Sequence, residues 1–474
     1  MIRRELVIVG AGPAGMAAAI TAGRRGTRVT VIDENPASGG QIYRQPPQSL
    51  AKSPAPAHDE SAAHGAQLRD AFARLGDRME LLSGTTVWGY FPQRRLAIRN
   101  EQGWQMIEAQ QVILAPGAYE FTPPFPGWTL PGVMTPGAAQ SMVKTMKIVP
   151  GKRVLIAGSG PFLLVVAGQL QAAGIEVVGV VEAARRRDLL RHLPGLLSDR
   201  KMLAQGRHYY RILKQAGIPF HWGHLVTEAK GSESVTEATI TPCSAESRPQ
   251  GPGITIPIDT LCVGYGFVPR MELAQMADCR IQYSELLGGW IPQVDENFET
   301  SVPGLRVAGD GGGVAGAMVA EWEGTLAALA ALHQLGELDA ATFETQRGPT
   351  VERLRKFQTF RAALDKIYRI RPGLIDLALP DTIVCRCEEL TRHEVEQGIQ
   401  FGGTEMRTLK VITRVGMGPC QGKMCWPTVA RMIATQKGKS ITDVGPVGVR
   451  PPIGPLEMAD LLNPQPMETP AETP

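Results

Sequence analysis

The chain has 474 residues, more than one hydrophobic core normally supports, and this length predicts two to four domains. Charged residues make up 20% and hydrophobic residues 43% of it, as in an ordinary globular protein. The net charge of +3, with both signs interspersed, argues against nucleic acid or an anionic membrane as a partner. No apolar run approaches the roughly eighteen residues of a spanning helix. Seven cysteines without a secretory segment predict reduced thiols in a cytoplasmic protein.

The N-terminal stretch "LVIVGAGPAGMAAAITAGRRGTRVTVIDE" contains the parts of a β-α-β unit in order. Leu6–Val9 predicts a buried strand, the GxGxxG turn follows it, and Val29–Ile32 predicts the next strand. Glycines there let the backbone approach a pyrophosphate at a helix N-terminus, and an acid after the second strand can hold a ribose. We therefore expect a dinucleotide site, the alternative being a glycine-rich turn in an unrelated α/β domain. Its candidate residues are Gly10, Gly12, Pro13, Ala14, Gly15, Asp33 and Glu34.

Three further segments resemble motifs of the two-dinucleotide-domain flavoproteins. In "QVILAPGAYE" a strand enters a small-residue turn, in "TSVPGLRVAGDGGGVAGAMVAEWEG" a strand ends before a small-residue helix, and "SGGQIYR" follows the first unit. The resemblance implies that the dinucleotide is FAD and that Asp310 meets its ribitol and phosphate region. The alternative interpretation of Asp310 is a helix cap beside a turn. These segments add the candidates Gly40, Gln41, Ala115, Gly117, Gly309 and Asp310.

A second β-α-β unit lies in "GKRVLIAGSGPFLLVVAGQLQAAGIEVVGVVEAARRR". Leu163 stands where the third glycine of the motif belongs, and it should push the helix from the strand or crowd a pyrophosphate. We therefore expect the fold to be kept while ordinary nicotinamide chemistry is lost. The domain would hold NAD, another adenine nucleotide or nothing. Its candidate residues are Gly158, Gly160 and Glu182.

Two groups of polar residues near this unit have simple structural interpretations. Arg185, Arg186 and Arg187 could receive an extra phosphate, but such a run is more often a solvated face. His221 and His224 are three apart in an expected strand, which puts them on opposite faces, so we do not expect a joint ligand pair.

Four of the seven cysteines form two tight pairs near the C-terminus. "VCRCEEL" holds Cys385 and Cys387, and "GPCQGKMC" holds Cys420 and Cys425. Four thiolates near helix N-termini suit a [2Fe-2S] cluster, because backbone amides stabilise their charge. Structural zinc also takes four cysteines, but zinc ribbons favour CxxC pairs. The CxC and Cx4C spacings therefore favour iron and sulfur.

Helix-start signals follow both pairs. Thr391 and Glu394 form a capping-box pattern, which places the first pair on the loop just before a helix. Pro427 predicts the start of another helix directly after the second pair. A longer amphipathic helix is expected before them, with Leu354, Phe357, Phe360, Leu364 and Ile367 at spacings of three and four residues, as a connector packed on the flavin domain.

The cysteine segment "CRCEE…TRVGMGPCQGKMC" resembles the [2Fe-2S] domain of the bacterioferritin-associated-ferredoxin type. Nearly end to end, the chain resembles the α-type subunit of heteromeric dye-linked dehydrogenases. That group includes opine oxidases, hydroxyproline and proline dehydrogenases, and hydrogen cyanide synthase. Further matching stretches are "PGWTLPGVMTPGAAQ", "LCVGYGFVP" and "RPPIGPLEMADLL". Leu163 departs from the family's second nucleotide site.

The resemblance implies an α/β fold with two Rossmann-like dinucleotide-binding domains and a small C-terminal α-helical [2Fe-2S] domain. It also implies a separate β-type flavoprotein subunit that oxidises an amino-acid, opine or D-hydroxyproline-type substrate; an optional third component is a small ferredoxin-like γ subunit. This chain would pass electrons through FAD and the cluster to an acceptor, in the cytoplasm or at the membrane surface through its complex. The alternatives are a self-contained NAD(P)H-dependent flavoprotein reductase and a zinc-stabilised nucleotide-binding scaffold. No HExxH, GxSxG or P-loop is present, and no catalytic residue is assigned.

The expected domains follow from these segments. The proline-rich tail is either disordered or, over 450–456, an extended strap across a partner subunit. The expected ranges are 1–148 with 270–335 for the FAD-binding domain, 149–269 for the second nucleotide-binding-like domain, 336–374 for the helical connector, 375–445 for the [2Fe-2S] domain and 446–474 for the tail.

Overall fold

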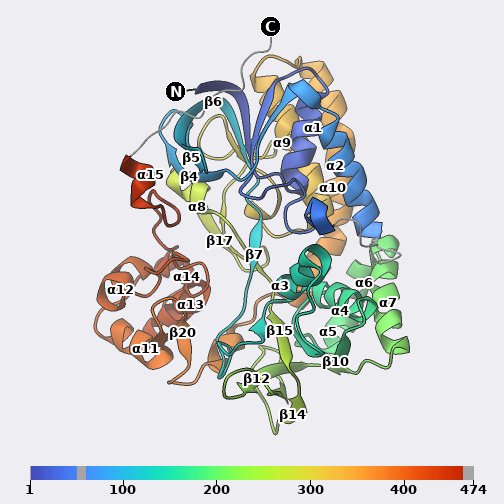
Figure 1. The fold of residues 1–474 in the computed structure, drawn as a ribbon, viewed down its shortest axis with the longest axis vertical. Helices are drawn as coiled ribbons and strands as arrows, with labels where there is room; N and C mark the ends of the chain where they lie inside the picture. Colours follow the sequence, from blue (N-terminus) through green and yellow to red (C-terminus); the bar gives the residue numbers. More distant parts are fainter. Residues whose placement is uncertain (1, 51–59, 463–474) are drawn as a thin grey trace.

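Two sheets in separate domains, joined by a short ribbon, form the frame of the molecule (Figure 1). The first sheet is mixed, because β4, β5 and β6 pair antiparallel, and the second is parallel. The computed structural model describes residues 2–50 and 60–462. The first sheet has the order β3-β2-β1-β6-β5-β4, and β19 also pairs with β6. Its strands are β1 (Ile2–Val9), β2 (Val29–Ile32), β3 (Met79–Leu82), β4 (Thr86–Phe91), β5 (Arg95–Asn100), β6 (Gly103–Leu114) and β19 (Leu305–Val307).

Three helices pack on this first sheet, namely α1 (Pro13–Gly23), α2 (Glu60–Ala73) and α9 (Ala317–Gln334). Helices α1 and α9 approach very closely, because a Cβ on Gly324 would lie only 2.0 Å from the carbonyl oxygen of Ala14. Small residues in both helices permit this contact. Helix α8 (Glu272–Met276) and the hairpin of β17 (Ile281–Ser284) and β18 (Gly289–Pro292) complete the domain.

The second sheet has the order β11-β10-β9-β15-β8, and all its pairings are parallel. Strand β8 pairs with β15 and so belongs to this sheet, although it precedes the boundary expected at residue 149. The strands are β8 (Val133–Met134), β9 (Arg153–Gly158), β10 (Glu176–Glu182), β11 (Phe220–Trp222) and β15 (Thr260–Gly264). The helices are α3 (Pro136–Ser141), α4 (Phe162–Ala172), α5 (Arg186–Arg191), α6 (Leu193–Leu196) and α7 (Arg200–Gln215).

A smaller antiparallel sheet extends this domain and contains β12 (His224–Lys230), β13 (Glu237–Pro242) and β14 (Ile254–Pro257). The prediction that His221 and His224 lie on opposite faces of one strand was wrong. Gly223, at a φ of 68°, turns the chain between β11 and β12. The two imidazole rings therefore meet edge to face, with centroids 5.8 Å apart.

The ribbon that joins the two domains consists of β7 (Ala118–Glu120) and β16 (Phe267–Pro269). The two strands are antiparallel, with Val268 opposite Tyr119. Figure 1 shows β7 running from the upper sheet down to the second domain.

The connector forms the long helix α10 (Ala340–Tyr368), and its apolar positions are buried or half-buried as predicted. Phe357 and Phe360 lie in one cluster with Val319 of α9 and Leu196 of α6. The connector therefore covers the second domain as well as the flavin-type domain, more than the sequence led us to expect.

Past the connector, the chain crosses the second domain through η5 (Pro372–Leu377) and enters a small helical domain. The predicted capping box is confirmed, since Thr391 and Glu394 bond reciprocally at the start of α11. Helix α13 begins directly after Cys425, with Pro427 in its first turn. The elements are β20 (Ile383–Cys385), β21 (Leu390–Thr391), α11 (Arg392–Gln400), α12 (Met406–Thr413), α13 (Trp426–Lys437) and α14 (Ile441–Val444).

The described part of the tail, which ends in α15 (Met458–Leu462), lies across this chain's own first domain. The Gln275 side chain donates to the Val447 carbonyl at 2.8 Å, and the Ile453 amide donates to the Trp88 carbonyl at 3.0 Å. These contacts are internal, and they leave the strap hypothesis untested; residues 463–474 lie outside the described range. Within residues 2–50 and 60–462, no helix combines the length and apolarity that crossing a membrane requires.

Candidate functional site

The predicted flavin segments meet at one edge of the first sheet. Strands β1, β6 and β19 are parallel neighbours, and their last residues Val9, Leu114 and Val307 are in register. The GxGxxG turn, the turn after Leu114 and the turn at 309–311 (η4) therefore emerge side by side. The carboxyl edge of a parallel sheet is where such folds bind ligands.

The three glycines of the first turn have different roles. A Cβ on Gly15 would lie 1.8 Å from the Gly10 carbonyl oxygen, and one on Gly10 would lie 2.3 Å from the Ala115 oxygen. Both glycines therefore allow close backbone packing. A Cβ on Gly12 would meet nothing closer than the Gly40 Cα at 3.8 Å, so the space beside Gly12 is open. Because α1 has neither a side-chain cap nor an acid in its first turn, its amide groups can receive a phosphate there.

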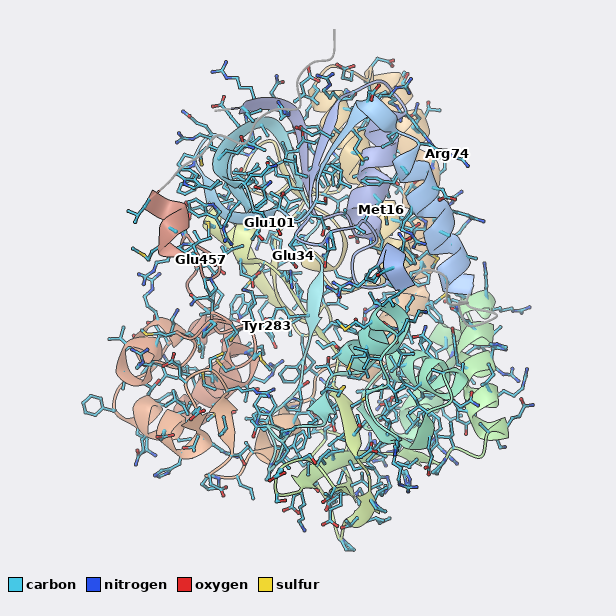
Figure 2. All side chains as sticks on the ribbon, viewed as in Figure 1. Met16, Glu34, Arg74, Glu101, Tyr283 and Glu457 are labelled. Carbon is cyan, nitrogen blue, oxygen red and sulfur yellow. The ribbon has the colours of Figure 1, made fainter. Side chains whose placement is uncertain are left out.

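The acid after β2 supports this turn. The Asp33 carboxylate is buried and accepts hydrogen bonds from the Ala11 amide at 2.5 Å and from the Asn35 amide at 2.7 Å. A carboxylate has about four acceptor sites, so it can still accept from a ribose hydroxyl. Glu34, labelled in Figure 2, instead pairs with Arg270 at 2.9 Å.

Asp310 fixes the loop before α9 with one carboxylate oxygen, but it does not cap the helix. Its Oδ1 accepts from the amides of Ala315 and Gly316, both at 2.9 Å, just before α9. The Gly39 amide donates to the Ala11 carbonyl at 2.8 Å, which brings Gly40 beside Gly12. These segments fit FAD as a group, and their roles as individual cofactor contacts stay predictions. The neighbours Pro13, Ala14, Gln41, Ala115, Gly117 and Gly309 lie on the same turns.

Sequence reasoning missed one acid at this edge, Glu323 on α9. Its side chain is half-buried and accepts from the Gly309 amide at 2.8 Å. Burial, and then the nearby charge of Asp310, raise the pKa of Glu323 to about 8, while Arg361 opposes the shift. The sequence feature that could have identified Glu323 is an acidic residue within a helix of small residues, in "AEWEG".

The second β-α-β unit repeats the link between acid and turn. Glu182 is buried and accepts from the Gly160 amide at 3.0 Å and the Ala184 amide at 2.8 Å. Burial raises the pKa of Glu182 to about 7. Leu163 lies in the core between helix and sheet, and its amide bonds to Gly160 three residues back at 3.2 Å. The first turn of α4 is therefore tighter than that of α1, where Met16 bonds four residues back to Gly12 at 2.9 Å.

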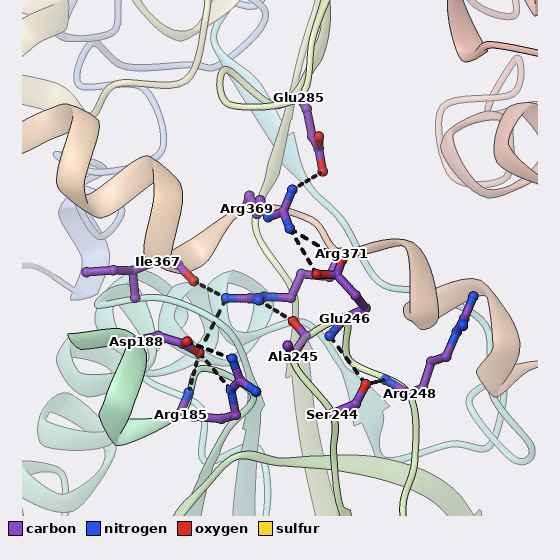
Figure 3. A network of polar contacts seen from close by, with 10 residues as sticks. All are labelled: Arg185, Asp188, Ser244, Ala245, Glu246, Arg248, Glu285, Ile367, Arg369 and Arg371. Atoms are coloured by element: carbon purple, nitrogen blue, oxygen red, sulfur yellow. Dashed lines mark hydrogen bonds and ion pairs between the residues drawn. The ribbon is translucent and has the colours of Figure 1, made fainter. Parts of the chain in front are cut away.

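The three consecutive arginines beside this unit differ in their surroundings. Arg186 and Arg187 are exposed, whereas Arg185 bonds bidentately to Asp188 at 3.0 and 2.8 Å. Arg371, from the segment after α10, lies 3.5 Å from the same aspartate (Figure 3). Arg185 is thus held by protein groups, which fits the structural interpretation better than a free phosphate receptor.

The four clustered cysteines come together as two pairs. The thiols of Cys385 and Cys425 hydrogen-bond to each other, and so do those of Cys387 and Cys420. The pKa of Cys385 is lowered to about 6 by its bond to Cys425 and by the backbone amides of Gly416, Glu388 and Cys387, while that of Cys425 is raised. Cys385 is therefore the first thiolate of its pair.

A glycine allows the two cysteine-bearing loops to approach each other closely. A Cβ on Gly418 would lie 2.3 Å from the Cys387 Cβ, so only glycine lets the second loop reach the first. All seven cysteines are free thiols. Across the described ranges, no three or more His, Cys, Asp or Glu side chains form a group that could hold a single metal ion. Two pairs of soft thiol ligands with amides directed at sulfur are a donor set that suits a two-iron cluster.

The cysteine domain docks on the ribbon and its surroundings. The Trp426 indole N–H donates to the Tyr119 hydroxyl oxygen at 3.0 Å, and the Trp128 indole N–H donates to the Ile383 carbonyl at 2.7 Å. Arg431 of α13 donates to the Tyr283 hydroxyl of β17 at 3.2 Å, at the junction visible in Figure 2. The two candidate sites are thus parts of one packed unit.

Comparison with known proteins agrees with this architecture. Residues 4–324 match the pyridine nucleotide-disulphide oxidoreductase family, and residues 380–463 match the sarcosine oxidase A3 domain. An opine oxidase subunit of Agrobacterium tumefaciens (strain Ach5) is 35% identical, over 97% of this chain and 91% of that protein. Hydrogen cyanide synthase subunit HcnB of Pseudomonas aeruginosa is 35% identical, over 96% of this chain and 98% of that protein.

A solved structure supports the fold over nearly the whole chain. L-proline dehydrogenase from P. horikoshii superposes with a TM-score of 0.68 at 20% identity, covering 97% of this chain and 79% of that one. The family match implies FAD as the cofactor of the first domain. The chain is an oxidoreductase that belongs to the pyridine nucleotide-disulphide oxidoreductase family, within the group that contains hydrogen cyanide synthase subunit HcnB and the matching opine oxidase subunit.

Proposed function

We propose that this chain is the electron-transfer subunit of a heteromeric dye-linked amino-acid, opine or D-hydroxyproline-type dehydrogenase. A substrate-oxidising β flavoprotein subunit would supply electrons, which pass through FAD and a [2Fe-2S] cluster to an acceptor. A small γ subunit is an optional further partner. The relatives named as subunits of opine oxidase and hydrogen cyanide synthase support the subunit role.

One observation carries the proposal. Two pairs of thiols gather in a small domain that packs against β7, the strand that directly follows the turn at Ala115 and Gly117. A relay needs its two redox groups in one rigid unit, and the bonds from Trp426 and Trp128 supply that rigidity. A bound FAD can take two electrons together and release them singly. This property suits a site between a substrate that gives up two electrons and an iron–sulfur cluster that carries one at a time.

The residues of this chain have distinct roles in this proposal. Gly12 and the amides of α1 would receive the pyrophosphate, and Asp33 a ribose hydroxyl. Cys385, Cys387, Cys420 and Cys425 would ligate the irons, with the amide of Gly416 donating to sulfur. No residue of this chain is assigned to the substrate, because that chemistry belongs to the partner.

The first test is visible absorption and metal analysis of the chain purified without oxygen, before and after dithionite. Bound flavin with about two irons per chain, bleached on reduction, is the expected result. Cys420→Ser should lose most of the iron and keep the flavin, while Cys279→Ser, which changes a buried thiol elsewhere, should keep both. One zinc and no iron in the unaltered chain would refute the cluster.

The second candidate function is a self-contained NAD(P)H-dependent flavoprotein reductase. Glu182 favours it, because this acid holds the Gly160 amide as Asp33 holds that of Ala11. The reductase would bleach its flavin on addition of NADPH to the isolated chain. The relay instead predicts little bleaching until the substrate and the β subunit are present.

A further inference from the structure

We propose that α5, α6 and α7 form a surface that docks on an anionic membrane, lying on it without crossing it. This proposal does not depend on the electron relay. The net charge of +3 argued against such a partner, but the positive charge is concentrated in one segment. Residues 186–214 contain eight Lys and Arg residues and two acids, and all eight of these cationic residues are exposed. We call these exposed cations the basic surface.

The charge of the basic surface is not neutralised by this chain. Within residues 2–50 and 60–462, none of its eight cations forms an ion pair. The two acids of the segment have internal roles: Asp188 pairs with Arg185 at 2.8 Å, and Asp199 accepts from the Met202 amide at 3.0 Å as the cap of α7. Negative charge that could neutralise the surface therefore has to come from another molecule or from salt ions.

Helix α7 presents its cations along one side. Arg200, Arg207, Arg211 and Lys214 follow one another at spacings of seven, four and three residues, which places them in one stripe of a helix. Leu213, on the other side of the helix, is fully buried in the core of the second domain. Figure 1 shows α6 and α7 on the flank of the molecule opposite the cysteine-domain helices α11 and α12.

Exposed leucines lie among these cations. Leu190, Leu193 and Leu197 are 69%, 39% and 50% exposed, and they lie between Arg187 and Arg200 in the chain. Single exposed apolar side chains are ordinary, but three within eight residues form a local apolar patch. Leucines beside cations can enter the boundary between lipid head groups and acyl chains while the cations stay at the phosphates.

A groove of about 460 Å³ lies between this segment and α10. It is lined by three groups that can carry positive charge, Arg191, His192 and Lys366, and by small apolar residues that include Pro194 and Ala363. The groove therefore has cations for a phosphate and apolar surface for the carbon atoms next to it. This is the chemistry of an anionic lipid head group and the start of its chains.

A membrane fits this combination better than an acidic protein does. Charged residues, lysine among them, are depleted from the centres of protein–protein interfaces. An acidic protein would have to present carboxylates at fixed positions along a helix of 16 residues, whereas anionic lipids can move to the cations. A cluster of four to eight Lys and Arg residues at a membrane surface is attracted by the negative potential of anionic lipids.

The test is flotation of the full chain with lipid vesicles. We expect it to float with vesicles of equal parts phosphatidylglycerol and phosphatidylcholine, to stay unbound with phosphatidylcholine alone, and to be released by high salt. The double variant Arg207→Gln with Arg211→Gln should lower the partition coefficient about thirtyfold. Leu193→Ser with Leu197→Ser should lower it about tenfold without any change of charge.

Matched controls lie on the cysteine domain. Arg407→Gln with Lys439→Gln removes the same charge from exposed positions there, and Phe401→Ser removes an apolar side chain from a residue that is 84% exposed. Both controls should float like the unaltered chain. All the substituted residues are exposed, so folding should be preserved.

Three results would overturn the proposal. If the unaltered chain does not float with the anionic vesicles, the basic surface serves another partner, such as an acidic protein. Equal flotation with both lipid compositions would show that the cations are not used. Undiminished flotation of the leucine variant would make the surface a general site for polyanions. The electron relay is tested separately by iron and flavin content, so either proposal can fail while the other stands.

Discussion

The open space at Gly12 allows flavin binding to be separated from folding. Gly12 has a φ of −77° and a ψ of −171°, which alanine adopts without strain, and its added methyl would meet only the Gly40 Cα at 3.8 Å. We expect Gly12→Ala to change the free energy of unfolding of the flavin-free chain by less than about 0.5 kcal/mol. The methyl would however occupy the space that a pyrophosphate needs over the start of α1.

The magnitude follows from overpacking by one methyl group. Such an intrusion costs about 1–3 kcal/mol, which weakens FAD affinity roughly 5- to 150-fold. Gly15→Ala is the contrast, because its methyl would lie 1.8 Å from the Gly10 carbonyl oxygen and α1 would have to move. That variant should lose about 3 kcal/mol or more of stability, with or without FAD.

Two measurements distinguish the variants. Urea unfolding of the flavin-free chains gives their relative stability, and fluorescence titration with FAD gives affinity. Gly12→Ala should fail only in the second assay, and Gly15→Ala in both. If Gly12→Ala binds FAD as tightly as the unaltered chain, the first glycine turn does not hold the pyrophosphate and our assignment of the site is wrong.

Two further predictions concern the half-buried Glu323 and a helix cap. The pKa of Glu323 is raised from 4.5 to about 8, so the folded chain binds the extra proton between these values and its stability should fall as the pH rises through that window, on the order of a few kcal/mol. Glu323→Gln should flatten this slope in urea titrations from pH 5 to 8, and an equal slope in both proteins would contradict it. Thr391→Ala removes the capping box of α11, so hydrogen exchange of the α11 amides should quicken about fivefold. Thr345→Ala, at an exposed position of α10, is its control and should leave those amides unchanged.

The short-range features of this protein can be predicted from its sequence. The strand, turn and strand of each β-α-β unit, the capping box at Thr391 and the helix start at Pro427 all depend on residues within a few positions of each other. Backbone conformation, capping and apolar periodicity act over that range. The cysteine spacing likewise indicates a cluster of thiols before any fold is known.

Other features depend on which surfaces pack together, and local sequence patterns do not predict this packing. The prediction for His221 and His224 was wrong because Gly223 turns the chain between them. The turn brings their two side chains together. Strand β8 joined the second sheet through a two-residue pairing too short to read from periodicity.

The sequence by itself determined the two β-α-β units and the four clustered thiols. The tertiary structure alone decided that Cys385 pairs with Cys425 and Cys387 with Cys420, that Glu323 bonds to the Gly309 amide, and how the cysteine domain is placed. Tyr119 and Trp426 are 307 residues apart in the chain and 3.0 Å apart in space. Contacts of that kind arise from the packing of whole domains, since side chains so distant in sequence impose no pattern on one another.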